Sequence, residues 1–138
     1  MLESIVSAPY AAILEKALGA SSLRNKVISN NIANVNTPGF KKSKVAFESL
    51  LQQALGDNGS SLPLVKTNEK HLPLTVSRQD VEPVVSLIGN TSMRTDGNNV
   101  DVDMEMAELA KNTLYYNAVA QQIGKYYSGI KSVINGGK

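Results

Sequence analysis

The chain has 138 residues, the usual length of a single domain. Its 14 basic and 12 acidic side chains leave a formal net charge of +2, too small a balance to indicate nucleic-acid binding, which usually needs a clustered basic face. The lack of cysteine excludes disulfides and thiol chemistry, and no run approaches the ~18 apolar residues that indicate a membrane span.

The first residues do not have the composition of a signal peptide. Ser4 to Leu14 is mostly apolar, but Glu3 precedes it and the segment carries no Lys or Arg, so a classical cleaved signal is not expected. Two phenylalanines and no tryptophan are a thin aromatic supply for a globular core. We therefore expect the chain to bury apolar surface against other copies or partners.

A helix is expected in the N-terminal segment, beginning near Pro9, because proline is tolerated in a first helical turn. Its heptad positions are Leu14, Leu18, Ser21, Asn25, Ile28, Ile32 and Val35. Two of these positions are polar. A buried polar residue in such a seam lowers stability but can fix register and partner choice.

The helix leads into an amide-rich stretch, N-N-I-A-N-V-N-T-P-G-F, at residues 30–40. Thr37 precedes proline and is disfavoured in helical conformation, so the helix must end by about Asn36. Pro38-Gly39 fits a type II turn, in which glycine accepts positive φ. Local capping explains Asn36 and, less directly, Asn34.

Capping does not explain Asn30 and Asn31, which lie a turn earlier and flank Ile32 in the seam. Amides both donate and accept hydrogen bonds, so these two suit polar contacts between closely packed helices. Phe40 follows the sharp turn and is placed to fold back on an apolar face.

The middle of the chain, Lys41 to Val100, has a different character. We expect a short helix over Val45–Leu55, a flexible loop over 56–61, a strand over Val84–Ile88 and a turn at Asp96-Gly97. The intervening sequence is broken into short extended pieces by Pro63, Pro73 and Pro83.

The C-terminal segment gives the clearest periodicity. A helix from about Asp103 to Asn135 would be roughly 50 Å long, with Asp101 and Asp103 as candidate N-caps and Gly136 and Gly137 as a stop. Its predicted heptad seam is Val102, Met106, Leu109, Thr113, Tyr116, Ala120, Ile123, Tyr127, Ile130 and Ile134. A stripe of small residues, Ala120, Gly124 and Ser128, predicts a close approach by another helix.

The sequence thus predicts a mainly α fold, in which terminal helices over 1–36 and 101–138 form a coiled-coil domain and residues 37–100 form a small insertion with loops and strands. Two interpretations of the seams remain open at this point. The helices form an ordinary intramolecular hairpin, or they complete their packing in an assembly.

The chemical inventory argues against an enzyme. His71 is the only histidine, so with no cysteine a typical zinc site cannot be built. The acidic stretch 96–103 fails the EF-hand pattern, since Val100 and Asp101 stand where a ligand and a glycine are needed. No nucleophile–base pair or phosphate loop is visible, and Lys41, Lys42 and Lys44 are interpreted as a solvated face. No cofactor, metal, nucleic acid or small-molecule substrate is expected.

The string S-N-N-I-A-N-V-N-T-P-G-F at Ser29–Phe40, paired with a C-terminal heptad helix, resembles the N-terminal signature of the bacterial flagellar rod, hook and hook-associated proteins. The short length is similar to that of the two short proximal-rod types of that family, and the motif at Asp96–Ala110 resembles one of them, with the other type as the alternative. The resemblance implies terminal helices that form a coiled-coil domain and polymerise. It further implies export by the flagellar type III apparatus, and assembly with copies, other rod proteins, and adaptor and ring or export-gate proteins at the membrane end.

The residues expected at the assembly interface combine the seams, the amide cluster and the turn. They are Leu14, Leu18, Asn25, Ile28, Asn30, Asn31, Ile32, Asn34, Val35, Pro38, Gly39, Phe40, Met106, Leu109, Tyr116, Ala120, Ile123, Gly124, Tyr127, Ile130 and Ile134. The alternative from another class is a soluble coiled-coil adaptor or export chaperone that binds one helix and does not polymerise.

Overall fold

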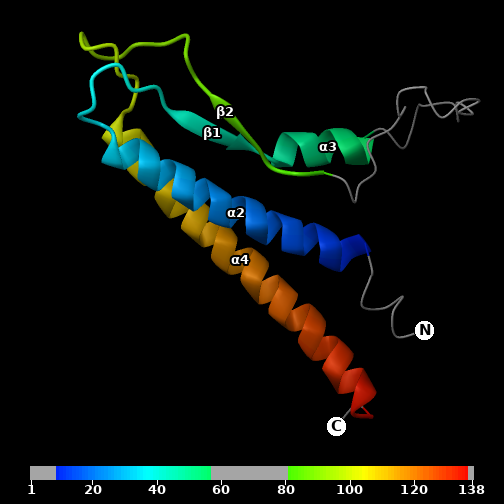
Figure 1. Cartoon of the computed structure of the whole chain (residues 1–138). Helices are drawn as coiled ribbons and strands as arrows, with labels where there is room; N and C mark the ends of the chain where they lie inside the picture. The colour runs from blue at the N-terminus through cyan, green and yellow to red at the C-terminus, as the bar shows by residue number, and fades with distance from the viewer. Residues whose placement is uncertain (1–8, 57–80, 137–138) are drawn as a thin grey trace, which may run out of the picture.

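The computed structural model describes residues 9–56 and 81–136. Two long helices, α2 (Pro9–Ala33) and α4 (Val102–Ile134), pack side by side, and the chain between them forms a thinner layer on α2. That layer contains strand β1 (Ser43–Ala46), helix α3 (Glu48–Gly56) and strand β2 (Val84–Leu87). The mainly helical fold with a small strand-containing insertion is confirmed (Figure 1).

The predicted ends of both long helices hold to within a few residues. Helix α2 begins at Pro9 and ends at Ala33, and Gly39 adopts a φ of +72°, as the Pro38-Gly39 turn requires. Helix α4 begins at Val102, one residue earlier than expected. Its N-cap is Asp101, whose carboxylate accepts hydrogen bonds from the backbone amides of Asp103 and Met104, so Asp103 lies in the first turn and is not the cap.

Only one of the two rows of the predicted apolar seam of α4 faces α2 in the single chain. Leu109, Tyr116, Ile123 and Ile130 are half-buried as expected, but the row that alternates with them is shifted by one residue. The buried positions are Glu105, Asn112 and Val119. The residues predicted in their place, apart from the half-buried Ala120, are exposed: Val102, Met106, Thr113, Tyr127 and Ile134. Polar contacts with α2, described below, set this register.

The helix predicted over Val45–Leu55 is also wrong at its start, because Val45 lies in β1 and the helix begins at Glu48. Strand β1 pairs antiparallel with β2, with Val45 opposite Val85 and Ala46 opposite Val84. The predicted strand in this region is confirmed as β2. Pairing with a segment about 40 residues away overrides the local helical pattern.

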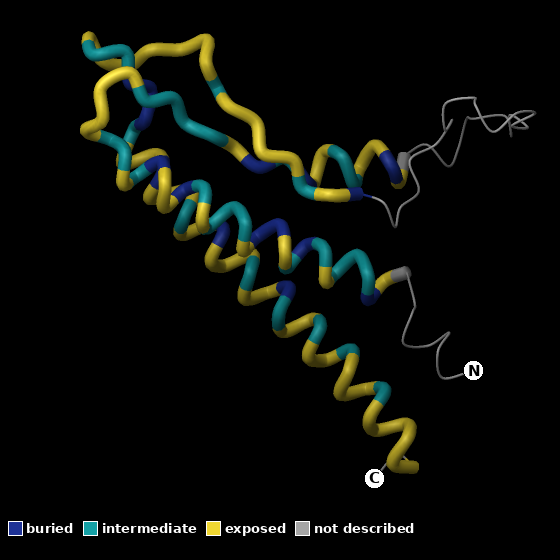
Figure 2. The backbone as a smooth tube through the Cα atoms, viewed as in Figure 1, coloured by how far each residue is buried: buried dark blue, intermediate teal, exposed yellow. Residues whose placement is uncertain are grey.

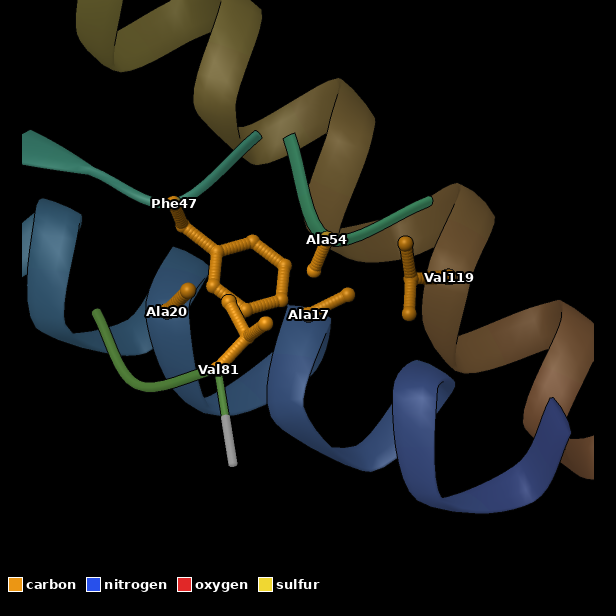
Figure 3. Close-up of a cluster of buried hydrophobic side chains, with 6 residues drawn as sticks. All are labelled: Ala17, Ala20, Phe47, Ala54, Val81 and Val119. Carbon is orange, nitrogen blue, oxygen red and sulfur yellow. The ribbon is translucent and has the colours of Figure 1, made fainter. Parts of the chain in front are cut away.

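The apolar core is small and lies between α2, the insertion and α4. Phe47, which follows β1, is 1% exposed and packs with Ala17 and Ala20 of α2, Ala54 of α3 and Val81, while Val119 joins from α4 (Figure 3). Alanines on α2 let the insertion approach closely. Phe47 is the one aromatic member of this cluster, and the partly buried Leu14, Leu18, Leu50, Leu51 and Ile123 pack against the cluster.

Burial is unevenly distributed along the helical pair. The half of α4 beyond Val119 is mainly exposed or half-buried, and Val133 and Ile134 are 78% and 62% exposed (Figure 2). The first residues of the chain, the predicted loop residues 57–61, Pro63, Pro73 and His71 lie outside the described residues.

Candidate assembly interface

Six polar side chains are buried in the described part of the chain, and five of them are hydrogen-bonded. They are Ser21, Asn31, Asn98, Asn99, Glu105 and Asn112, here called the buried polar network. The hydroxyl of Ser21 has no hydrogen-bond partner among the described residues. A buried amide or carboxylate is tolerated only when its hydrogen bonds are made, so the network fixes the relative positions of the segments that it joins.

Asn31, near the end of α2, joins three segments through one amide. Its Oδ1 accepts from the backbone N–H of Ser43 at 3.0 Å, and its Nδ2 donates to the carbonyl oxygen of Ser43 at 2.9 Å. Nδ2 also donates to Glu105 Oε2 of α4 at 3.0 Å. The outer edge of β1 is thus paired by a side chain much as a neighbouring strand would pair it.

Glu105 is the acidic member of the network and is 6% exposed. Besides the amide of Asn31, it lies 3.5 Å from the ammonium group of Lys42, which belongs to the segment entering β1. A buried carboxylate needs such compensation, because removal from water penalises its charged form. Lys42 is therefore a structural partner of α4, whereas the sequence predicted a solvated basic face.

Asn98, in the segment before α4, holds the turn that follows α2. Its Nδ2 lies 3.1, 3.0 and 2.9 Å from the carbonyl oxygens of Asn34, Val35 and Thr37, which follow the last turn of the helix. Its Oδ1 accepts from the backbone N–H of Val100 at 2.7 Å. One buried amide from a distant segment thus binds the carbonyls of the turn that follows α2.

Asn99 extends the two-stranded ladder by one rung. The backbone N–H of Ile88 donates to the Lys42 carbonyl directly at 2.9 Å. The reciprocal hydrogen bond, from Lys42 N–H to the Ile88 carbonyl, is replaced by two bonds to the Asn99 side chain. Lys42 N–H donates to Asn99 Oδ1 at 2.7 Å, and Asn99 Nδ2 donates to the Ile88 carbonyl at 2.6 Å. The amide is inserted where a backbone bond would otherwise close the pair.

The two ends of the insertion also touch through backbone and basic side chains. Gly39 N–H donates to the Asp96 carbonyl at 2.9 Å. Lys41 Nζ donates to the carbonyls of Thr91 and Gly97, each at 2.7 Å. The chain therefore leaves and re-enters the helical pair at one place.

A second polar contact lies in the middle of the helical pair. Asn112 of α4 donates to the Ser21 carbonyl at 2.9 Å and to Asn25 Oδ1 at 2.8 Å. Arg24 lies 3.4 Å from Asn112 Oδ1 and forms an ion pair with Glu48 of α3 at 2.6 Å. Asn112 and Glu105 are one heptad apart, and together they account for the shifted seam.

The charge of Glu48 is stabilised by this arginine. Burial opposes ionisation, but the hydrogen bond and charge of Arg24 outweigh it, so the pKa of Glu48 is lowered. On the neighbouring α4, burial and the charge of Glu48 raise the pKa of the Tyr115 phenol.

Tyrosines bridge the helices toward the start of α2. The rings of Tyr10 and Tyr126 lie 5.9 Å apart, and Gln122 donates to the Tyr10 hydroxyl at 2.9 Å. The Tyr127 hydroxyl donates to Glu15 at 2.7 Å, a hydrogen bond that raises the pKa of that phenol. At this end the helices are joined by exposed polar and aromatic contacts in place of a packed core.

The predicted interface residues fall into three groups by exposure. Buried within the chain are Ile28 and Asn31. Half-buried are Leu14, Leu18, Asn25, Ile32, Asn34, Val35, Phe40, Leu109, Tyr116, Ala120, Ile123 and Ile130. Exposed are Asn30, Pro38, Gly39, Met106, Gly124, Tyr127 and Ile134. The exposed residues are the predicted interface positions that remain accessible to a neighbouring chain.

Sequence reasoning missed Asn98, Asn99, Glu105 and Asn112. The first two were interpreted as part of a turn before the N-caps, and the other two lie just outside the predicted apolar seam. The available signal was the Asn-Asn pair one residue ahead of a helix N-cap, since amides that are not needed for the turn itself are free to bond distant backbone.

Neither a membrane-crossing helix nor a metal site emerges from the described ranges. No helix within residues 9–56 and 81–136 is long and apolar enough to cross a membrane. Those ranges also contain no group of three potential metal-ligating side chains.

Comparison with known proteins matches the sequence of the chain to one family. Residues 13–41 match the family model described as "Flagella basal body rod protein". Flagellar basal body rod protein FlgB of Bacillus subtilis (strain 168) is 41% identical over 125 residues, which is 91% of this chain and 92% of the relative. The chain belongs to the flagellar basal body rod protein family.

Relatives from distant bacteria agree with this membership. The FlgB proteins of Borreliella burgdorferi and Yersinia ruckeri are 39% and 33% identical over 120 and 127 residues, covering 85% and 89% of this chain and 89% and 91% of the relatives. All of them carry the name of the rod protein, and none the name of an adaptor or chaperone. A structural role in the rod is the function that this family membership supports.

The segment that matches the family model contains two members of the buried polar network, Ser21 and Asn31. Residues 13–41 span most of α2 and the Pro38-Gly39 turn, and they include the carbonyls that Asn98 binds. Within this rod-family chain, the matched segment thus holds the contacts that join α2 to the insertion and to α4.

Proposed function

We propose that this chain is a structural subunit of the proximal rod of the bacterial flagellar basal body, where it polymerises with other rod proteins into the torque-transmitting shaft. The observation that carries the proposal is the similarity to FlgB proteins over about nine-tenths of the chain. The fold supports it: α4 exposes large apolar side chains that the single chain does not cover.

The partners follow from the same similarity. The exposed members of the predicted interface, including Met106, Gly124 and Ile134, contact copies of the chain or other rod proteins. The adaptor subunit and the ring or export-gate proteins are the partners at the membrane end. The flagellar type III apparatus exports the chain without cleavage of a signal peptide.

The test is to ask where the protein resides in motile cells. A strain in which the chromosomal gene is deleted is complemented with the same gene on a plasmid, and the basal bodies, cytoplasm and medium are probed with an antibody. We expect motility to be lost on deletion and restored on complementation, with the protein in the basal-body fraction. A protein that stays in the cytoplasm of motile cells and is absent from basal bodies would instead indicate a soluble adaptor or chaperone.

A further inference from the structure

Strand β2 forms one edge of the two-stranded sheet, and all of its residues are exposed (Figure 1). Val84, Val85 and Leu87 are 51%, 46% and 67% exposed. The other edge of the sheet is different, because there the Asn31 side chain of α2 bonds both backbone groups of Ser43. The sheet therefore has one edge that a side chain of α2 closes and one edge that carries exposed apolar side chains.

The register of the sheet shows which backbone groups point outward from β2. Ile88 N–H donates to the Lys42 carbonyl at 2.9 Å, so these two residues form a hydrogen-bonded pair. Such pairs alternate with non-hydrogen-bonded pairs along an antiparallel ladder, which places Val85 and Leu87 in non-hydrogen-bonded pairs. The other edge agrees, since Ser43, opposite Leu87, directs its own backbone groups away from β2. The N–H and C=O groups of Val85 and Leu87 thus point outward, and they have no hydrogen-bond partner among the described residues.

Unpaired backbone groups on an exposed edge strand are a template for a further strand. Natural edge strands are often protected by a charged residue, a proline or a bulge. The segment Val84–Leu87 has the sequence V-V-S-L and pairs continuously with β1, so it has none of these protections. Because the strand is short, a partner must also contact its apolar side chains. The edge therefore fits an extended backbone with apolar side chains.

Lys44 places a positive charge beside this edge. It lies in β1 opposite Ser86, so the two side chains emerge on the same face of the sheet. Lys44 is exposed, and its ammonium group has no ion pair or hydrogen bond in the described ranges. A strand added outside β2 would lie about 10 Å from β1, which is two strand spacings. A lysine and a glutamate are long enough to meet over that distance across the small Ser86.

We propose that the outer edge of β2 binds an extended segment of another protein, which adds a third strand to the sheet. The segment presents apolar side chains on the face of Val85 and Leu87 and an acidic side chain on the opposite face, toward Lys44. The β2 strand of a second copy does not fit, because it carries no acidic residue and self-pairing closes into a dimer. The inference goes beyond the proposed function and holds for the single chain.

The first test measures binding of a probe peptide to the purified full-length chain. In the short labelled peptide valine alternates with threonine, and the central threonine is replaced by glutamate. We expect saturable binding by fluorescence anisotropy, and at least several-fold weaker binding of a matched peptide with lysine in place of the glutamate. Lys44→Glu should reverse this preference. Absence of binding, or equal binding of both peptides to the parent chain, would overturn the proposal.

The second test separates backbone pairing from apolar contact at Leu87. Leu87→Ala and Leu87→Pro both remove the leucine side chain, but only proline removes the outward N–H, and edge strands tolerate proline at such positions. We expect Leu87→Ala to bind the glutamate peptide weakly and Leu87→Pro not to bind it, with the circular dichroism of both variants unchanged. Equal binding by the two variants would show that the β2 backbone is not the site.

Amide hydrogen exchange of the unchanged chain tests the same edge without a substitution. The amides of Val85 and Leu87 should exchange fast in the free chain and at least several-fold more slowly with the glutamate peptide, whereas the Ser86 amide, which faces β1, should be protected in both states. Slow exchange at 85 and 87 in the dilute monomer would show that another part of this chain covers the edge. Slow exchange that develops only at high chain concentration would show a second copy there. Either result would overturn the proposal.

Discussion

Asn31 shows how much one amide contributes to this fold. It completes the edge of β1 and at the same time hydrogen-bonds the buried carboxylate of Glu105, so its replacement leaves groups of two other segments without partners. We predict that Asn31→Ala lowers the free energy of unfolding by about 1–3 kcal/mol or more, the usual cost of unsatisfied buried polar groups. The measurement is urea denaturation of the purified chain.

The neighbouring amide provides the matched control. Asn30 is exposed, so Asn30→Ala should leave the stability of the single chain unchanged or slightly raised, because alanine is the better helix former. If only the interface between subunits needs Asn30, that variant is secreted but is not incorporated into rods. Equal stability of the two alanine variants would contradict the intrachain role of Asn31.

The ion pair between Arg24 and Glu48 predicts a pH dependence. The pKa of Glu48 is lowered in the folded chain, so its contribution to stability is present above the unfolded-state pKa and is lost as pH falls through the folded-state pKa. We expect the stability advantage of the parent chain over Glu48→Gln to be present at neutral pH and to vanish in acid. An advantage that stays constant between neutral and acidic pH would show that the carboxylate charge is not involved.

At the scale of single residues, the sequence was informative about which residue types matter and less so about their partners. The amides at 30 and 31 were expected to make polar contacts between helices, and Asn31 does so with Glu105. The roles of Asn98 and Asn99 depend on carbonyls and amides more than 50 residues away in sequence, such as those of Thr37 and Lys42. No local pattern specifies such long-range pairs.

Among the helices and strands, α4 shows that a heptad repeat of apolar residues does not by itself determine which face of the helix packs against its partner. The predicted heptad seam counted hydrophobic residues, whereas the observed register places Glu105 and Asn112 against α2. A buried polar pair overrides a small gain in apolar burial, because leaving its groups unpaired costs more. The result is a helix with two usable faces: one contacts α2, and the other carries the exposed Met106 and Leu114.

Substitution of Gly124 tests whether a neighbouring chain contacts the exposed face of α4. A Cβ added there would meet nothing within 4 Å among the described residues outside its own helical turns, so Gly124→Ala should raise the stability of the single chain by up to ~1 kcal/mol, through helix propensity alone. We predict that Gly124→Leu is secreted yet blocks rod assembly and motility, because another helix approaches this position closely in the rod. Motility on soft agar and the basal-body fraction measure the effect.

The neighbouring Gly129 provides the control for bulk alone. Its position is equally open in the single chain but lies outside the predicted stripe of small residues. Gly129→Leu should therefore assemble better than Gly124→Leu. Normal swimming by the Gly124→Leu strain would remove the reason for a close approach at this position.

The molecule as a whole is held together mainly at one end. The buried polar network and the Phe47 core join α2, the insertion and the first half of α4, whereas the last residues of α4 extend with little cover. Helices without tertiary packing do not persist alone in water. We therefore expect order in the isolated chain to decrease along α4 toward its C-terminal end.

Amide hydrogen exchange of the dilute monomer checks this gradient. We predict slowest exchange around Ile28 and Asn112 and fastest exchange from Ser128 to Ile134, where side chains are mainly exposed. Uniform strong protection to the end of α4 would show that the helix does not need a neighbour.

The backbone hydrogen bond between Gly39 and Asp96 closes the insertion into a loop whose two ends meet beside the helical pair. Because its first and last residues are fastened together beside the helices, the separation of its ends does not depend on how many residues lie between them. The entropy of closing a loop rises only slowly with its length. The insertion therefore accommodates additional sequence at small thermodynamic cost, while the helical pair keeps its geometry. The length of the insertion is in this way independent of the packing of α2 against α4.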